Sequence, residues 1–312
     1  MSELGAHDWN ELWLLLRALA THRAEPERHG GPSSPCAPNG VLSVHRLAGE
    51  PPRVLHGEHP DAALVSRGLG HVATRRPPAD TARMLFELYA PLCHPLVEPS
   101  RPGRAHASCF VVAHLGQSLD GRIGPPDGHP EAITGPEDMT HNHRMRALFD
   151  VVLVGAGTVR HDNPTLTVRH VEGRNPVRVV VDPDRRLSSS YGVFNDGLAP
   201  TLLLCREELC STGERHGLAE VVGVGSGCSP RAVVGVLELR GLPRIFIEGG
   251  GVTVSRFLEA GCLDRLQLAV SPLIMGQGKP GIDLGETLRL RPRVRRFDLS
   301  HDVLFECCFD EN

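Results

Sequence analysis

The sequence lacks long apolar runs and an excess of basic residues. No segment reaches the roughly 18 uncharged apolar residues of a transmembrane helix, so we expect no contact with a membrane interior. The formal net charge of −4 and the pI of about 6.5 argue against a nucleic-acid partner. Glu3 and Asp8 precede the first apolar stretch, where a signal peptide would be basic, and we therefore expect a cytoplasmic protein.

Common catalytic and cofactor signatures are missing as well. The nine cysteines form no C-x-x-C pair and no zinc-site spacing, so we expect reduced thiols that serve as small apolar residues. There is no G-x-x-x-x-G-K-[ST] loop and no G-x-S-x-G elbow. His56-Gly57-Glu58 is not followed by the Pro-Cys-x-x-Cys of zinc deaminases. A P-loop hydrolase, an α/β-hydrolase and a zinc deaminase are therefore disfavoured.

The chain has two regions of different character. Residues 1–104 contain two helical patterns, Trp9–Ala20 and Asp80–Leu92, separated by segments rich in Pro, Gly and Ser. We predict an N-terminal extension of unknown role there. Residues 105–312 alternate apolar runs with amphipathic patterns and form the predicted enzymatic domain.

The second region predicts an α/β fold with a mixed, mostly parallel sheet and antiparallel strands at its C-terminal edge. Strands are expected at Cys109–Leu115, Val151–Val154, Val177–Asp182, Thr201–Cys205, Glu220–Val224, Arg244–Glu248, Leu266–Ser271, Leu290–Asp298 and Val303–Phe309. Helices are expected over 134–149, 229–241 and 249–261. Thr134 and Glu137 have the spacing of a capping box.

Two predicted strand ends offer groups for ligand binding. Glu248 is followed by Gly249–Gly251 and a helix, an arrangement that favours binding of a pyrophosphate, although tight packing is an alternative reason for the glycines. Asp182-Pro183 ends another strand, and Arg185 with Arg186 follows it. The two arginines would suit a cofactor phosphate, and a solvated surface pair is the alternative.

A third strand end begins the segment "GAGTVRHDNPTLTVR" at 155–169, which we expect to be a loop. Arg146 lies on the helix before this strand, and Arg169 closes the loop. Two arginines on either side of a strand–loop junction could clamp a phosphate, unless both are surface charges. At "SLDGR", Asp120-Gly121 indicates a turn after the first strand of the domain.

Taken in order, these segments resemble the reductase domain of bacterial riboflavin-biosynthesis enzymes, which has a dihydrofolate reductase-like fold. The matching stretches are "SLDGR" (118–122), "ITGPE" (133–137), "VLVGAGTVRHDNPTLTVR" (152–169), "PVRVVVD" (176–182), "FIEGGGVTVSRFLEAGCLDRL" (246–266) and "SPLIMGQG" (271–278). They cover roughly residues 108–309. The resemblance implies a homodimer, NADPH as cofactor, and a phosphorylated aminopyrimidine substrate whose ribosyl group is reduced to the ribityl form.

The resemblance also implies roles for individual positions. The expected catalytic residues are His114 and Glu248, and the expected substrate contacts are Arg146, Leu166, Arg169 and Glu248, with the two arginines on the substrate phosphate. The expected cofactor contacts are Gly116, Gln117, Thr158, Asp162, Pro183, Gly249, Gly250, Gly251, Val252 and Thr253. No metal ligands are expected.

Three positions depart from the family pattern. His114 stands where the family often has lysine, and Pro130 and Ala132 stand where a hydroxyl and an aromatic residue are common. The leading hypothesis is NADPH-dependent reduction of 5-amino-6-(5-phosphoribosylamino)uracil or a close relative. These departures leave open a reductase of another heterocycle or imine, and a nucleotide-binding module without catalysis is a third hypothesis. NADH also remains open as the cofactor.

Overall fold

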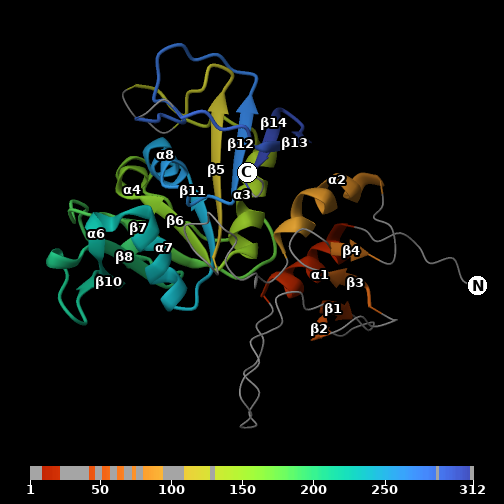
Figure 1. The fold of residues 1–312 in the computed structure, drawn as a ribbon, viewed down its shortest axis with the longest axis horizontal. Helices are drawn as coiled ribbons and strands as arrows, with labels where there is room; N and C mark the ends of the chain where they lie inside the picture. The colour runs from red at the N-terminus through yellow and green to blue at the C-terminus, as the bar shows by residue number, and fades with distance from the viewer. Residues whose placement is uncertain are drawn as a thin grey trace, which may run out of the picture. The chain divides into compact units, whose positions relative to one another are not determined.

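The computed structural model describes residues 9–21, 42–45, 51–56, 62–66, 72–74, 80–93, 109–126, 131–285 and 288–309. The chain divides into two compact units, Met1–Arg101 and Pro102–Asn312, drawn from red to orange and from yellow to blue in Figure 1. Pro130 lies outside the described residues. Within the described part, no helix combines the length and the apolar character needed to cross a bilayer.

The first unit contains a small antiparallel sheet that the sequence did not predict. Its strands are β1 (Leu42–His45), β2 (Arg53–His56), β3 (Leu64–Ser66) and β4 (Val72–Thr74), in the order β2-β1-β3-β4. Helix α1 (Trp9–Thr21), helix α2 (Asp80–Tyr89) and the 3₁₀ turn η1 (Ala90–Leu92) agree with the predicted helices. The apolar stripe of α1, including Leu12, Leu16 and Leu19, is fully buried.

The second unit is built on a ten-stranded sheet with the order β13-β14-β12-β5-β11-β6-β7-β8-β10-β9. Its strands are β5 (Phe110–Ser118), β6 (Val151–Gly155), β7 (Val177–Val181), β8 (Thr201–Arg206), β9 (Arg215–His216), β10 (Ala219–Val224), β11 (Arg244–Glu248), β12 (Arg265–Ser271), β13 (Arg293–Leu299) and β14 (Asp302–Cys308). The pairs from β12 to β10 are parallel, whereas β14, β13 and β9 are antiparallel to their neighbours. The predicted α/β fold with antiparallel C-terminal strands is confirmed.

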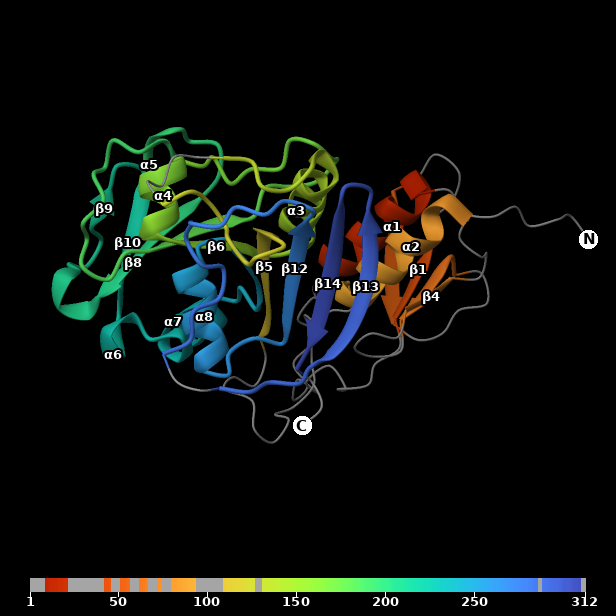
Figure 2. The same cartoon turned by 90° about the horizontal axis from the view of Figure 1, so that it is seen from above.

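Helices lie on both faces of this sheet. They are α3 (Pro136–Leu148), α4 (Ala156–Asp162), α5 (Gly192–Asn195), α6 (Gly225–Cys228), α7 (Pro230–Leu239) and α8 (Gly251–Glu259), with a 3₁₀ turn η2 (Glu207–Leu209). Figure 2 shows α3 and α4 on one face of the sheet and α7 and α8 on the other. The predicted helix over 229–241 is confirmed as α7, and the Ser229 hydroxyl caps it by accepting the N–H of Ala232.

Two local predictions were wrong. The segment after β6 is not a loop, since Ala156–Asp162 forms helix α4, which ends at Asn163 in a left-handed conformation. Thr134 does not form a capping box, because the N-cap of α3 is Gly135 and carries no side-chain hydrogen bond. The Thr134 hydroxyl instead donates to Oδ2 of Asp138 at 2.7 Å.

Candidate functional site

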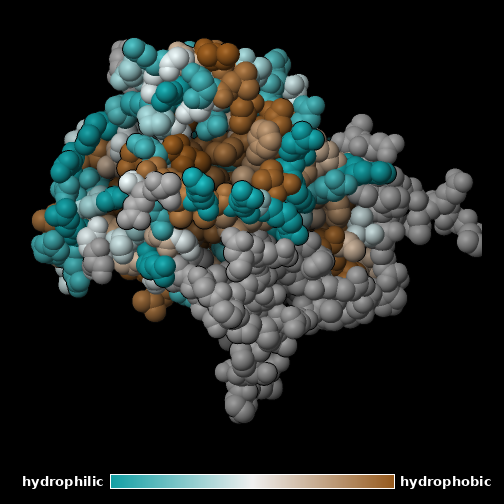
Figure 3. Space-filling model, turned by 45° about the horizontal axis from the view of Figure 1, so that its top comes forward, coloured by the Kyte–Doolittle hydropathy of each residue, from teal (hydrophilic) through white to brown (hydrophobic). Residues whose placement is uncertain are grey.

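A cavity of about 940 Å³ lies at the carboxyl ends of the central parallel strands. Its walls come from the ends of β5 and β11 and from the segments that follow β6, β7 and β11. This is the edge at which open α/β sheets bind ligands, and the volume is in the range of cofactor and substrate pockets. Figure 3 turns this end of the second unit forward and shows hydrophobic residues gathered there, with hydrophilic ones around them.

Most of the predicted site residues share this one cavity. The lining includes His114, Gly116, Thr158, Asp162, Leu166, Pro183, Glu248, Gly249, Gly250, Gly251, Val252 and Thr253. Arg146, Arg169 and Gln117 are not part of it. Among residues the sequence did not single out, Asp138, Asn142 and Lys279 line the cavity, and Lys279 is the only lysine of the chain.

The glycines after β11 form a tight turn that enters helix α8. Gly249 and Gly250 have φ values of 76° and 70°, which side chains rarely adopt. A Cβ on Gly250 would lie 2.9 Å from Oγ1 of Thr158, and one on Gly251 would lie 2.6 Å from the carbonyl oxygen of Pro280. Backbone conformation and close packing therefore require these glycines. The same geometry brings the uncapped N-terminus of α8 to the cavity wall.

An acid–base pair stands at the end of β5. Nε2 of His114 lies 3.1 Å from Oδ1 and 3.3 Å from Oδ2 of Asp138, and both residues are buried. Burial alone would lower the pKa of His114, but the charge of Asp138 and its hydrogen bond, with smaller contributions from Glu248 and Asp302, raise it above 6.5. Burial would raise the pKa of Asp138, but His114 and the Thr134 hydroxyl bring it to about 2.

A second histidine lies beside this pair and is neutral. The rings of His114 and His141 are 5.2 Å apart, and Nε2 of His141 is 2.9 Å from Oε1 of Gln267. Burial and the neighbouring charge of His114 lower the pKa of His141 to about 3. The surroundings therefore favour the charged form of His114 and the neutral form of His141.

Glu248 faces the cavity while it pairs with Arg146. The Arg146 guanidinium donates to both carboxylate oxygens of Glu248, through Nε at 2.6 Å and through a second nitrogen. It also donates to the carbonyl oxygen of Thr167 at 2.8 Å. Arg146 is 5% exposed, so its charge serves to orient Glu248 and the 163–169 segment in this structure. Its predicted contact with a substrate phosphate stays a prediction.

Leu166 and Arg169 leave the same segment in different directions. Leu166 has a φ of 56° and is buried in the cavity wall. Arg169 is exposed, and its guanidinium donates to the hydroxyls of Thr165 and Thr167. Its backbone N–H donates to Nδ1 of His143 at 2.9 Å. The segment therefore places Leu166 in the cavity wall and the charge of Arg169 at the surface.

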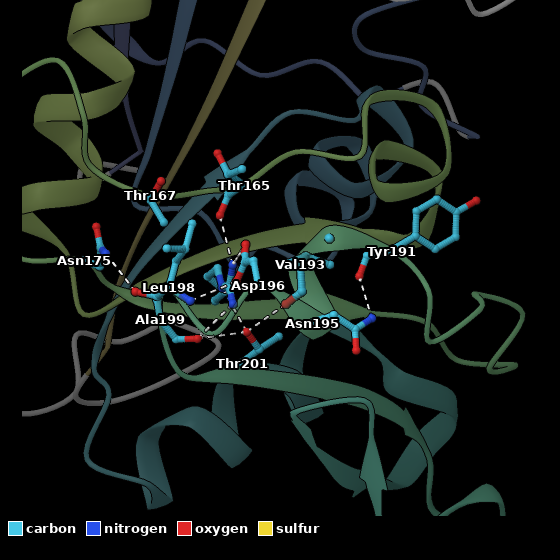
Figure 4. A network of polar contacts seen from close by, with 12 residues as sticks. Thr165, Thr167, Asn175, Tyr191, Val193, Asn195, Asp196, Leu198, Ala199 and Thr201 are labelled. Atoms are coloured by element: carbon cyan, nitrogen blue, oxygen red, sulfur yellow. Dashed lines mark hydrogen bonds and ion pairs between the residues drawn. The ribbon is translucent and has the colours of Figure 1, made fainter.

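A buried arginine that the sequence did not single out holds the 163–169 segment in place. Arg178 of β7 donates to the carbonyl oxygens of Thr165 and Ala199, the hydroxyl of Thr201 and the carboxylate of Asp196 at 2.7 Å. In Figure 4, Thr165 comes from the segment before β7, whereas Asp196, Ala199 and Thr201 come from the stretch that leads into β8. The only sequence signal was a charge inside the apolar run "PVRVVVD".

The remaining predicted positions lie at the rim or behind the wall. Gln117 packs against Gly281, where a Cβ would lie 2.8 Å from its Oε1. Arg185 is held by Glu214 and by the carbonyl oxygen of Leu209. Arg186 is exposed and pairs with Asp184 at 2.6 Å. Of the two arginines, Arg186 is the more accessible cation beside Pro183.

The RibD C-terminal domain family matches residues 109–301. The chain is 31% identical over 211 residues to the 2,5-diamino-6-ribosylamino-4(3H)-pyrimidinone 5′-phosphate reductase of Methanothermobacter thermautotrophicus, which covers 63% of this chain and 96% of that protein. It is 30% identical over 190 residues to the riboflavin biosynthesis protein RibD of Aquifex aeolicus, covering 59% of this chain and 53% of that protein.

A solved structure with the same fold is the deaminase/5-amino-6-(5-phosphoribosylamino)uracil reductase of Thermotoga maritima. The TM-score is 0.56 at 30% identity, and the match covers 64% of this chain and 56% of that one. The chain thus spans nearly the whole of the Methanothermobacter thermautotrophicus reductase and about half of the Aquifex aeolicus and Thermotoga maritima proteins.

Proposed function

Because the chain belongs to the RibD C-terminal domain family, we propose that it is an NADPH-dependent reductase of riboflavin-type biosynthesis. Its substrate is 5-amino-6-(5-phosphoribosylamino)uracil or a close relative, whose ribosyl group becomes a ribityl group. The observation that carries the proposal is a single cavity that joins a glycine turn at a helix N-terminus to the His114–Asp138 pair and Glu248.

The cavity wall fits the proposed cofactor. The turn at Gly249–Gly251 lines the cavity without side chains of its own, and the N-terminus of α8 offers a pyrophosphate backbone N–H groups and a favourable dipole. Thr158 and Asp162 line the same part of the cavity, next to Lys279. Pro183 and Arg186 would lie toward the adenosine end, and Gly116 toward the nicotinamide. When bound, NADPH supplies the hydride.

The chain's own share of the reaction is a proton and a fixed substrate geometry. His114 would give the proton on its ring to the sugar ring oxygen. The bond from C1′ to that oxygen then breaks, and its electron pair stays on the oxygen. The lone pair of the amino nitrogen attached to C1′ forms a C=N bond, and this bond is the one reduced. Glu248, fixed by Arg146, would hold the pyrimidine or ribose hydroxyls. Leu166 and Arg169 would complete the substrate site.

The direct test is NADPH oxidation, followed at 340 nm, with the deaminated phosphoribosylaminopyrimidine as substrate. We expect substrate-dependent oxidation and a ribityl product identified by mass spectrometry. Oxidation with a different heterocycle or imine, and none with this substrate, would favour the second hypothesis. Tight NADPH binding without turnover on any of these compounds would favour a binding module. A dimer, implied by the resemblance, is tested by light scattering.

A further inference from the structure

The orientation of His114 is determined by its contact with Asp138. Nε2 faces both carboxylate oxygens of Asp138, and a carboxylate only accepts, so the proton of this nitrogen lies between the two residues. Nδ1 of His114 is buried and has no hydrogen-bond partner among the described residues. His114 lines the cavity, and Nδ1 is the ring nitrogen that Asp138 does not engage.

The charged groups around His114 come from three elements and are mostly negative. Asp138 and His141 face it from α3, Glu248 from β11 and Asp302 from β14. His141 is neutral because burial and the charge of His114 lower its pKa to about 3. Glu248 is balanced by Arg146. Asp138 is therefore the nearest group that favours a proton on both ring nitrogens of His114.

Packing places the pair beside the predicted nicotinamide contact. A Cβ on Gly116 would lie 2.7 Å from Cγ2 of Thr134 and 3.4 Å from Oδ2 of Asp138. The absence of a side chain at Gly116 thus lets Thr134 hold Asp138 against the end of β5. Asp138, Thr134 and Gly116 all line the cavity in which reduction is proposed.

We propose that Asp138 is a positioning residue that keeps the His114 imidazolium in place with its Nδ1–H toward the substrate. Resting on the proposed function, this adds that reduction requires the protonated form of His114. A histidine, unlike a lysine, keeps its charge near neutral pH only when a neighbouring group favours it, and Asp138 is such a group here. Turnover should therefore be lost as the pH rises through the raised pKa of His114.

The first test measures the titration of His114 directly and needs no substrate. The ring protons of His114 are titrated by NMR in the full chain, with His114→Gln used only to assign the signal. We expect a midpoint above 6.5, and we expect His141 to stay neutral through this range. A His114 midpoint at or below 6.5 overturns the proposal.

The second test removes the charge of Asp138 but keeps its shape. In Asp138→Asn, the His114 midpoint should fall, because burial then acts without the largest of the contributions that raise the pKa. Turnover near pH 7.5 should fall about 10-fold, part of the roughly 100-fold that a positioned acid contributes, and should recover near pH 5.5. Asp138→Glu, which retains a carboxylate, should restore much of the neutral-pH activity.

The matched control is Asp264→Asn. Like Asp138, Asp264 is a buried carboxylate. It accepts the backbone N–H of Val111 at 2.7 Å and is not among the groups that shift the pKa of His114. Its pH profile should match that of the wild type. An unchanged His114 titration in Asp138→Asn overturns the positioning role. If His114 titrates as expected but the protein does not turn over the substrate, the proposed function is overturned. The pairing of His114 with Asp138 is then supported by itself.

Discussion

The two faces of the ten-stranded sheet bury different kinds of side chain. On the face that packs against α7 and α8, the central strands contribute Val111, Ala113, Ile245 and Ile247 to an apolar core. The opposite face carries buried polar and charged residues, among them His114, Arg178, Arg244, Arg265, Gln267 and Glu306, together with the partly buried Glu248. Register supports this division, because His114 pairs with Glu248 and Gln267, and Gln267 with Glu306.

Within a single strand, the residues on one face stabilise the fold and the residues on the other face build the site. Apolar burial stabilises the fold by about 25 cal/mol per Å² and places no demand on precise polar geometry. A buried charge is tolerated only when it is paired and hydrogen-bonded, so each one on the second face requires a partner at a fixed place. The first face therefore tolerates apolar exchange, whereas the second face specifies an arrangement of groups.

The largest loss of stability is expected from Arg178→Ala. This change leaves Asp196 without its partner and frees two backbone carbonyls, so we expect the free energy of unfolding to fall by about 3–5 kcal/mol. Urea unfolding followed by circular dichroism measures it. Arg240→Ala, which removes the exposed pair with Glu220, is the control and should cost about 0–1 kcal/mol. Equal losses in the two variants would contradict the difference between buried and exposed pairs.

Ile247→Ala tests the apolar face. Ile247 is fully buried, so we expect a loss of about 3 kcal/mol in the free energy of unfolding from lost burial and a residual cavity. The kcat of the folded protein should stay within about twofold of the wild type, because the side chain points away from the site. A large fall in kcat at unchanged folded fraction would show that the two faces are not separable.

Glu248→Gln tests the neighbouring position on the other face. We expect kcat/KM to fall about 100-fold, which corresponds to about 2.7 kcal/mol of transition-state stabilisation. Loss of the charge opposite Arg146 should also cost about 2 kcal/mol of stability. Steady-state kinetics and urea unfolding on the same sample separate the two effects. Activity close to that of the wild type would remove Glu248 from the site.

The smallest effect is expected from Arg169→Ala. Arg169 is exposed and is held by two threonine hydroxyls, so its removal should leave stability nearly unchanged. If it contacts the substrate phosphate, the KM for substrate should rise about 10-fold while the affinity for NADPH stays the same. Exposed Arg160→Ala is the control on the neighbouring helix. An equal loss of NADPH affinity in Arg169→Ala would contradict the substrate assignment.

The sequence predicted nine of the ten strands of the second unit, most of them from continuous apolar runs, and missed β9, which has only two residues. It also predicted the strand-end glycines and Glu248, since a strand, glycines and a helix follow one another there. The first-unit strands were missed because β1 to β4 are only three or four residues long and show no clear alternation. Local patterns thus predicted elements where the patterns were long enough.

The partner of His114 could not be predicted from local patterns. Asp138 lies 24 residues away on another element, and the pairing depends on how α3 packs against the end of β5. Thr134 shows the same limit, because its spacing to Glu137 matches a capping box while its hydroxyl binds Asp138. When a side chain has two possible partners, tertiary packing decides which one it binds, and the spacing in the sequence does not reveal that packing.

The alternation along β11 also determines which insertions and deletions the gene can accept. Ile247 and Glu248 are adjacent and face opposite sides, so deleting one residue in this strand would turn Glu248 into the apolar core and Ile247 into the cavity. One codon lost inside β11 would thus cost both the fold and the site at once. Single-residue changes in length should therefore be confined to the connections between strands, whatever substitutions the strands accept.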